Sequence, residues 1–311
     1  MQKLPKKIWM DGRMLDGEKA TVSVMAHALH YGDGVFEGIR CYRTARGPAI
    51  FRYDEHLERL LKSALCLGME IPYSKGQIAQ AGFDAIRANA LQACYLRPIA
   101  FRGLGAQGVN PTGAKVHVAV ITWEWGAYLG KDGAEKGARL VTSSFTRNHP
   151  NAMLTKAKVT GAYVNAVLAK LDAIRLGFDE ALMLDARGFV SEGAGENVFF
   201  VRGGKLYTVE ASTILEGITR DAVLEIARDE GIETAEVTAS RDQLYTADEV
   251  FLTGTAAEIT PVREIDLRTI GSGKVGPLTR RIRSRFEAVV RGKDSTFERW
   301  LTYVDAKVRT A

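Results

Sequence analysis

Three groups of residues in this chain of 311 residues could together bind one phosphorylated aldehyde cofactor. Lys158 lies in a loop just ahead of a predicted helix, and its amine could condense with an aldehyde. Glu192 precedes residues 193–195, Gly-Ala-Gly, whose small size lets a backbone approach a flat ring closely. Residues 217–219, Gly-Ile-Thr, begin a predicted helix whose first amides favour an anion. The three groups therefore predict a site for pyridoxal phosphate, with partners for its aldehyde, ring nitrogen and phosphate.

The carboxylate and the amine have different expected roles. Glu192 is expected to pair with the ring nitrogen and keep it protonated, so that a carbanion formed when a proton leaves can spread into the ring. Glu196 follows closely, and we assign it no catalytic role. Lys156 competes with Lys158 for the aldehyde, and spacing alone does not choose between the two lysines.

The phosphate is expected at the helix start, where the helix dipole favours negative charge. The amides of Ile218 and Thr219 are the candidate donors, together with the hydroxyls of Thr219 and Thr255. Arg59 could add a charge-assisted hydrogen bond. The run from 254 to 257, Gly-Thr-Ala-Ala, follows a predicted strand and offers further backbone amides, suited to the phosphate or to a substrate carboxylate.

A phenol and a guanidinium are predicted to share one face of a strand. In the predicted strand from 95 to 102, side-chain alternation places Tyr95 and Arg97 on the same side. Such a pair can receive a carboxylate, although an ordinary solvent-facing strand would look the same.

Composition favours a globular protein without metal or disulfide chemistry. Hydrophobic residues make up 46% and charged residues 25% of the chain, as in soluble proteins. No apolar stretch has the length of a signal peptide core or a membrane span, so we expect a cytoplasmic protein. Cys41, Cys66 and Cys94 form no Cys-x-x-Cys pair, and His27 and His30 lack a third ligand nearby, so no metal site is expected.

The net charge of +5 raises the alternative of a nucleic-acid-binding protein or a non-catalytic cofactor-binding protein. Much of the positive charge lies between 280 and 293, where basic residues alternate with Ile282, Phe286, Val289 and Val290. This pattern is typical of the solvated face of an amphipathic helix. We therefore expect partners that are small molecules, with no nucleic acid and no membrane.

The order of predicted elements indicates an α+β protein of two domains. Asp11 and Gly12 predict a tight hairpin, Asp54 is predicted to cap a helix that ends near Gly68, and Ser74 with Gln77 predicts a capping box. The segment 126–137 contains four glycines and no periodicity, which is typical of a linker. We expect an N-terminal α/β domain over 1–125, an interdomain loop over 126–137, and a C-terminal α/β domain over 138–311 that carries the cofactor lysine, with the cofactor at the domain interface.

The whole pattern resembles the class IV (fold type IV) pyridoxal phosphate aminotransferases, of the D-amino acid aminotransferase-like fold, over roughly residues 8 to 305. Within them it is most similar to the branched-chain amino acid aminotransferases. The family signature runs from the ring-nitrogen glutamate through the phosphate turn. The positions that fall on it are Glu192, Asn197, Thr208, Gly217, Ile218 and Arg220. Narrower motifs, at 27–32, 35–40, 95–98, 125–130 and 254–261, point to the branched-chain group.

The resemblance implies a role for each matching residue. Lys158, five residues before Tyr163, is implied as the catalytic lysine, and Tyr163 is expected near the phenolic oxygen of the cofactor. The implied cofactor-binding residues are Arg59, Lys158, Tyr163, Glu192, Ile218, Thr219 and Thr255. The implied substrate-binding residues are Tyr31, Phe36, Tyr95, Arg97, Trp125, Tyr128, Ala256 and Ala257. Among these, Tyr95 and the amides of Ala256 and Ala257 are expected to meet the α-carboxylate, and Arg97 the side-chain carboxylate of glutamate.

The implied activity is transfer of the amino group of L-leucine, L-isoleucine or L-valine to 2-oxoglutarate. The alternative on the same fold is a D-amino acid or (R)-amine transaminase, or an aminodeoxychorismate lyase. The resemblance also implies a homodimer or homohexamer, in which the Tyr31 region and the loop near Val109 reach into the neighbouring site.

Overall fold

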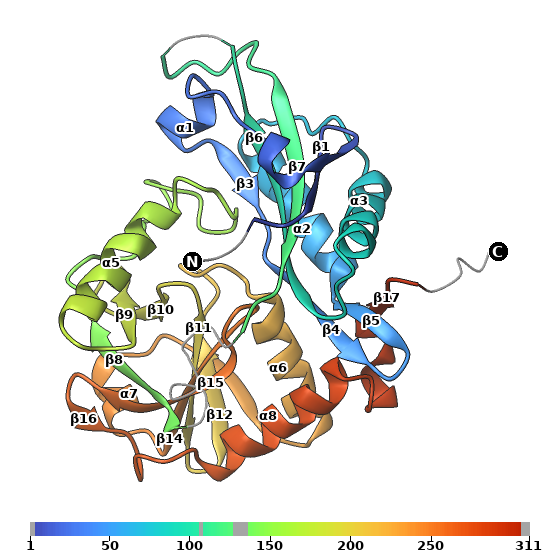
Figure 1. Ribbon diagram of the computed structural model, residues 1–311. Helices are drawn as coiled ribbons and strands as arrows, with labels where there is room; N and C mark the ends of the chain where they lie inside the picture. Colours follow the sequence, from blue (N-terminus) through green and yellow to red (C-terminus); the bar gives the residue numbers. More distant parts are fainter. Residues whose placement is uncertain (1–3, 106–107, 127–135, 306–311) are drawn as a thin grey trace. The chain divides into compact units, whose positions relative to one another are not determined.

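A computed structural model describes residues 4–105, 108–126 and 136–305 (Figure 1). Its contacts divide the chain into two compact units, each made of several stretches of sequence. Unit 1 contains residues 1–125, 157–161 and 288–311, and unit 2 contains residues 126–156 and 162–287. The segment with Lys158 is grouped with unit 1, because its backbone bonds to residues of that unit. The division into consecutive domains, with the lysine in the second, stays a proposal. Most of the predicted interdomain loop lies outside the described residues.

The chain begins with the predicted hairpin. Strands β1 (Lys7–Met10) and β2 (Arg13–Asp16) pair antiparallel, with Met10 opposite Arg13. Both residues of the turn, Asp11 and Gly12, have positive φ values of 48° and 83°. A turn of this kind matches the twist of the two strands, and Gly accepts it without steric cost.

An eight-stranded antiparallel sheet forms the framework of unit 1. Its order is β17-β5-β4-β6-β7-β1-β2, and β3 pairs with β6 beside this path. The remaining strands of this sheet are β3 (Gly34–Phe36), β4 (Ile39–Thr44), β5 (Gly47–Phe51), β6 (Cys94–Arg102), β7 (Val116–Trp123) and β17 (Leu301–Tyr303). Strand β6 agrees with the predicted strand from 95 to 102 to within one residue at each end.

The helices of unit 1 are α1 (His27–Tyr31), α2 (Tyr53–Cys66) and α3 (Lys75–Ala88), with 3₁₀ turns η1 (Gly17–Lys19) and η2 (Ser295–Trp300). The predicted capping box of α3 is confirmed, since Ser74 and Gln77 exchange both bonds. The prediction that Asp54 caps α2 is wrong: Arg52 is the N-cap, with φ 50°. Its amide donates to Trp300 O at 2.7 Å, so a contact distant in sequence sets the helix start.

A nine-stranded mixed sheet forms the framework of unit 2. Its order is β10-β9-β8-β15-β14-β11-β12-β13, and β16 pairs with β15. The strands are β8 (Ala138–Thr142), β9 (Glu180–Leu184), β10 (Val190–Gly193), β11 (Asn197–Arg202), β12 (Lys205–Val209), β13 (Thr234–Val237), β14 (Glu249–Gly254), β15 (Glu258–Ile265) and β16 (Arg268–Thr269). Strand β11 is buried on both faces, because Phe199 stacks on Phe251 while Phe200 joins the cluster with Leu182 and Leu252.

The described residues of unit 2 form helices α5 (Tyr163–Arg175), α6 (Ile218–Asp229), α7 (Arg241–Tyr245) and α8 (Pro277–Val290); the last residues of α8 belong to unit 1. Helix α5 packs through Ala169 and Ala173 on Ala181 and Met183 of β9. Helix α8 is amphipathic as predicted. Its Arg285 pairs with Asp229 and Glu230, so part of its positive charge is balanced within the fold. In the described ranges no helix is long and apolar enough to cross a bilayer.

Candidate active site

The backbone of Lys158 is held in place by unit 1. Its amide donates to Ser63 Oγ of α2 at 3.0 Å, and its carbonyl accepts from the Phe36 amide of β3 at 3.1 Å. The next residue, Val159, forms an isolated bridge with Val35. The Lys158 Nζ lies 5.2 Å from the centre of the Phe36 ring. The loop therefore presents this amine beside an aromatic side chain at a fixed position.

Lys156 has different surroundings. Its Nζ donates to Ile214 O at 3.1 Å and lies 3.4 Å from Glu216 Oε1, both in the stretch that leads into α6. These two oxygen partners hold the Lys156 amine against the stretch that leads into α6. The two candidate lysines thus differ in their contacts, which their spacing in the sequence did not reveal.

Arg97 lies in a box of aromatic rings in unit 1. Its guanidinium carbon is 4.7 Å from the centre of the Phe36 ring, 5.5 Å from Tyr95 and 5.6 Å from Trp123. The Arg97 Nε is buried, with no hydrogen-bond partner among the described residues. A buried donor without a partner is costly unless a ligand satisfies it. The box can therefore take an apolar group against its rings and a carboxylate against Arg97.

Tyr95 owes its position to a glycine. A Cβ atom on Gly38 would lie 1.8 Å from the Tyr95 hydroxyl oxygen, so no larger residue fits there. The Tyr95 ring centre is 4.5 Å from that of Trp125, which extends the aromatic wall. The structure thus brings together four of the candidate substrate-binding residues, Phe36, Tyr95, Arg97 and Trp125. Tyr31 lies at the end of α1, 47% exposed, and Tyr128 lies outside the described residues.

Arg59 is positioned by a buried carboxylate. Glu37, with no exposed surface, accepts from Arg59 Nε at 2.6 Å and Nη2 at 2.9 Å, and from His56 Nδ1 at 2.7 Å. Burial lowers the pKa of His56, so its imidazole is neutral at pH 7 and donates from Nδ1. Burial opposes the charge of Glu37, but Arg59 and the hydrogen bonds outweigh it and hold the pKa of Glu37 well below its ordinary value.

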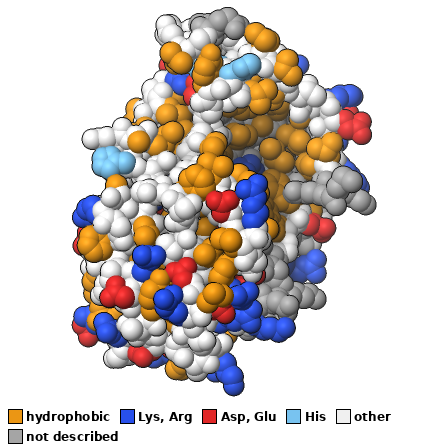
Figure 2. All heavy atoms as spheres, turned by 90° about the vertical axis from the view of Figure 1, so that its left-hand side faces the viewer, with side chains coloured by type: hydrophobic (Ala, Val, Ile, Leu, Met, Phe, Trp, Pro, Cys, Tyr) orange, Lys and Arg blue, Asp and Glu red, His pale blue; other side chains and the backbone are white. Residues whose placement is uncertain are grey.

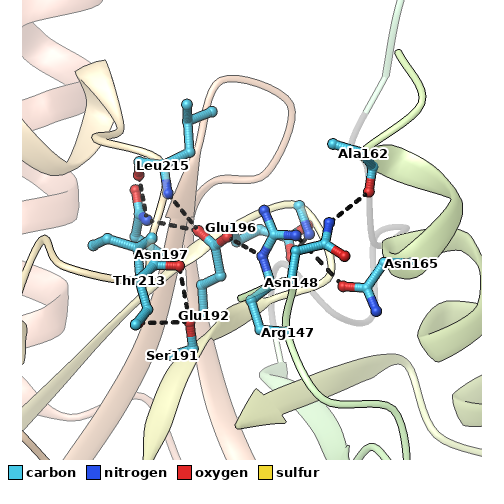
Figure 3. Close-up of polar contacts among 12 residues, drawn as sticks. Arg147, Asn148, Ala162, Asn165, Ser191, Glu192, Glu196, Asn197, Thr213 and Leu215 are labelled. Carbon is cyan, nitrogen blue, oxygen red and sulfur yellow. Dashed lines mark hydrogen bonds and ion pairs between the residues drawn. The ribbon is translucent and has the colours of Figure 1, made fainter. Parts of the chain in front are cut away.

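Glu192 is the centre of a polar cluster in unit 2 (Figure 3). Its Oε1 accepts from Arg147 Nε at 2.6 Å, and its Oε2 accepts from Asn197 Nδ2 at 3.2 Å and the Leu215 amide at 3.3 Å. Strand β10 carries the glutamate, which is 5% exposed. Several donors on one buried carboxylate favour its ionised form and fix its plane. The cluster thus offers an oriented anion, as a protonated ring nitrogen requires.

Two more buried acids accompany Glu192. Glu180 pairs with Lys170 at 2.7 Å, whereas Glu196 accepts from the Gly195 amide at 3.1 Å. Burial and the neighbouring Glu180 raise the pKa of Glu196 to about 8. Glu196 is therefore a neutral acid at pH 7.

The neutral state of Glu196 predicts a pH-dependent stability. Its pKa is about 8 in the folded chain, against an ordinary 4.5, so unfolding releases a proton between these values and stability falls as pH rises through this window. Each pKa unit is worth about 1.4 kcal/mol. The free energy of unfolding of Glu196→Gln, relative to that of the native protein, should therefore rise by about 2–4 kcal/mol from pH 5 to pH 8. Urea denaturation at both pH values measures this difference. The exposed Glu210→Gln variant is the control, and a gain independent of pH would contradict the assignment.

The start of α6 is open for an anion. Its N-cap, Gly217, makes no side-chain capping bond, and the first amides of a helix have no acceptor within the helix. A Cβ on Gly217 would lie 2.0 Å from Asn197 Oδ1, so only glycine fits. Because Asn197 also donates to Glu192, one side chain ties the carboxylate to the helix start, and unit 2 brings these two predicted groups together.

The remaining predicted residues lie on turns and helix ends. Thr255, Ala256 and Ala257 form the turn between β14 and β15, next to Gly254. A Cβ atom added to Gly254 would lie 3.3 Å from the carbonyl oxygen of Gly195. Tyr163 is the first residue of α5 and is half-buried.

The two histidines considered as metal ligands have other partners. His27 Nδ1 lies 2.9 Å from Asp33 and His30 Nε2 lies 2.8 Å from Val24 O. No group of three or more metal-binding side chains occurs within residues 4–105, 108–126 and 136–305.

Three functional candidates escaped sequence reasoning: Arg147, the Glu37–His56 pair and Trp123. Arg147 is 45 residues from its carboxylate partner, and no local pattern marks it. Trp123 carried a signal, since it comes two residues before Trp125 and strand alternation places the two rings on the same side. The i, i+3 spacing of His56 and Arg59 on α2 indicated a shared face, but not the carboxylate that both contact.

A lysine held at a fixed position and an oriented buried carboxylate are residues that the chemistry of an aminotransferase needs. The profile of the family described as "Amino-transferase class IV" matches residues 34–265. The chain belongs to this family.

Individual relatives carry a narrower name. A "Branched-chain-amino-acid aminotransferase" of Pseudomonas aeruginosa is 46% identical over 297 residues, covering 96% of this chain and 97% of the relative. The solved structure of the Escherichia coli branched-chain amino acid aminotransferase has a TM-score of 0.95 and 44% identity, and covers 97% of this chain and 100% of its own. A further solved branched-chain amino acid aminotransferase, with pyridoxamine 5'-phosphate, has a TM-score of 0.95 and 53% identity, and covers 98% of this chain and 100% of its own.

Proposed function

We infer that the protein is a pyridoxal phosphate-dependent aminotransferase of branched-chain amino acids. It moves the amino group of L-leucine, L-isoleucine or L-valine to 2-oxoglutarate, giving branched 2-oxo acids and L-glutamate. The observation that carries this inference is the aromatic box with Arg97 at its edge, in a chain whose relatives bear that name. One pocket must take an aliphatic side chain in one half-reaction and a carboxylate in the other, and rings with a single cation suit both.

The residues present fit pyridoxal phosphate. The start of α6 has no side-chain cap to compete with a phosphate, and Glu192 is a buried carboxylate already oriented by three donors. When bound, the cofactor supplies an aldehyde for covalent linkage and a ring that accepts the electrons left by a departing proton. We assign Lys158 the linkage and the movement of that proton.

The other assignments follow the residue chemistry. Glu192 holds the ring nitrogen, and Tyr163 lies near the phenolic oxygen. Arg59, Ile218, Thr219 and Thr255 hold the phosphate through a guanidinium, amides and hydroxyls. Tyr95 and the amides of Ala256 and Ala257 receive the α-carboxylate, and Arg97 receives the second carboxylate of glutamate. We assign the side-chain pocket to Tyr31, Phe36 and Trp125, and also to Tyr128, which lies outside the described residues.

We propose that the protein acts as a homodimer or larger homo-oligomer. Helix α5 exposes an apolar row at helical spacing, with Val164 60%, Val167 52%, Leu171 44% and Ile174 56% exposed. Figure 2 shows hydrophobic side chains open to solvent on the side of the molecule where α5 lies. Such a row is typical of an interface with another chain. Exposure of Tyr31 and of Val109, at 83%, fits residues that complete the site of a neighbouring copy.

A cytoplasmic location is part of the same proposal. Cys41 and Cys94 are buried free thiols and Cys66 is an exposed one, which suits a reducing compartment.

A donor panel with 2-oxoglutarate tests the function. We expect the purified protein to form L-glutamate from L-leucine, L-isoleucine and L-valine, and far less from D-alanine or an (R)-amine. Activity confined to the D or (R) compounds would reject this proposal in favour of the alternative on the same fold.

In the same panel, the Arg97→Met variant should lose about 10- to 100-fold in kcat/KM for 2-oxoglutarate, because a hydrogen bond to a charged group is worth about 1.5–3 kcal/mol. Its single-turnover rate with L-leucine should change much less, and the exposed Arg43→Met variant is the control.

A further inference from the structure

Arg147 forms an ion pair with Glu192 and has no role in the assignments above. Its Nε lies 2.6 Å from Glu192 Oε1, and the side chains of the pair are 13% and 7% exposed. Figure 3 shows Arg147 beside Glu192, with Asn148 and Asn165 next to it. Contacts this close and this buried influence which charge state Glu192 adopts.

Arg147 is itself held in position. Its amide donates to Leu184 O of β9 at 2.8 Å, and its Nη1 lies 3.4 Å from Asn165 Oδ1 of α5. Asn165 in turn donates to Thr146 O at 2.9 Å, and Asn148 donates to Ala162 O at 3.2 Å. The guanidinium is therefore fixed by the sheet and by the first turns of α5.

The three buried acids of this region, Glu180, Glu192 and Glu196, differ in their surroundings. Lys170 pairs with Glu180, and Glu196 is kept neutral by burial, with its pKa raised to about 8. Glu196 therefore does not compete for Arg147. The positive charge of Arg147 acts on Glu192.

A carboxylate and a pyridine nitrogen that face each other share one proton. With the proton on the nitrogen, the pair is an anion beside a cation; with the proton on the carboxyl, both groups are neutral. Arg147 is hydrogen-bonded directly to Glu192, whereas it would act on a ring nitrogen only across that carboxylate, so it interacts more strongly with the carboxylate charge. In a buried site its attraction to the carboxylate then exceeds its repulsion of the pyridinium.

We propose that Arg147 is a positioning residue that holds Glu192 ionised and thereby places the shared proton on the ring nitrogen of the cofactor. This rests on the proposed function, in which Glu192 is the partner of that nitrogen. Arg147 touches neither cofactor nor substrate. It acts through the charge and orientation of Glu192.

The test measures the proton on the ring nitrogen directly. Apoprotein is reconstituted with pyridoxal phosphate labelled with ¹⁵N in the ring, and the ¹⁵N chemical shift reports whether that nitrogen is protonated. The native protein should show a protonated nitrogen at pH 7.5, and Arg147→Gln an unprotonated one. Arg147→Lys, which keeps the charge, should restore protonation at least in part. We expect kcat of Arg147→Gln to fall about 10- to 100-fold with KM within about three-fold, the range found for outer partners of functional groups.

Arg187 provides a matched control. It lines the same cavity of about 210 Å³ as Arg147, but it pairs with Asp185 at 2.8 Å, and its side chain is 60% exposed. Arg187→Gln should therefore leave the ring nitrogen protonated and kcat near the native value. A role that is merely structural would lower the melting temperature of Arg147→Gln without moving the ¹⁵N shift.

A second variant covers the case in which Arg147→Gln does not fold. Arg147→His carries a cation at pH 5.5 and a neutral ring at pH 8. Its ring nitrogen should be protonated at the lower pH and not at the higher, while the native nitrogen stays protonated at both.

Different results would overturn the proposed function and the role of Arg147. A native protein that binds no pyridoxal phosphate, or a Glu192→Gln variant that keeps the ring nitrogen protonated, would overturn the proposed function or its assignment of Glu192. A native protein and Glu192→Gln that behave as expected, beside an Arg147→Gln or Arg147→His that stays protonated at pH 8, would overturn the role of Arg147 alone.

Discussion

Replacing Lys158 by alanine should abolish the covalent attachment of pyridoxal phosphate and lower kcat by at least about 10³-fold, because one amine both links the cofactor and moves the proton. The absorbance band of the lysine-linked cofactor should disappear from the variant. Borohydride reduction of the native protein, followed by peptide mass spectrometry, should place the label on Lys158. The backbone of Lys158 is held by Ser63 and Phe36, so the loop should keep its position when the side chain is truncated.

Lys156→Ala is the matched control, two residues away in the same loop. Its ammonium is occupied by Ile214 O and Glu216, and it should lose less than about ten-fold in kcat while keeping the absorbance band, since exposed ion pairs contribute little. Label on Lys156, or an unchanged band in Lys158→Ala, would reverse the assignment of the two lysines.

The largest effect on stability is expected at Glu37. Its carboxylate is fully buried and accepts hydrogen bonds from Arg59 and His56, so Glu37→Gln removes the negative charge that faces both side chains in a poorly solvated place. Removing one partner of a buried ion pair costs about 3–5 kcal/mol, and we expect about 3 kcal/mol because Arg59 keeps 15% of its side chain exposed. Urea denaturation of the apoprotein measures the change in the free energy of unfolding.

Glu58→Gln on the same helix is the control, because Glu58 and its partner Lys62 are both exposed and the change should be within the error of the measurement.

The stabilisation by Glu37 should depend on pH. The pKa of Glu37 is lowered in the folded chain, so its contribution is present above pH 4.5 and is lost as the pH falls below that value. The difference between native protein and Glu37→Gln should therefore be constant from pH 8 to pH 5 and shrink in stronger acid. A constant difference down to pH 3 would exclude the ion pair as its cause.

Local signals predicted the elements that depend on neighbours in the sequence. The Asp11–Gly12 hairpin and the Ser74–Gln77 capping box involve residues at most a few positions apart, and both are present. The start of α2 was predicted wrongly, because the contact between Arg52 and Trp300 joins residues far apart in the chain. The same distance in sequence hid the pairs Arg147–Glu192 and Glu37–Arg59, which no periodicity or motif connects.

The residue types that can do chemistry were already determined by the sequence: a lysine before a helix, a glutamate on a glycine-rich bend, a Gly-Ile-Thr helix start and a Tyr-x-Arg strand. These depend on the chemistry of single side chains and on short-range geometry, which the order of residues specifies directly. Only the tertiary structure decided which charges meet. A buried carboxylate becomes a fixed anion, as Glu192 and Glu37 do, or a neutral acid, as Glu196 does, according to which cations the fold brings within hydrogen-bond distance.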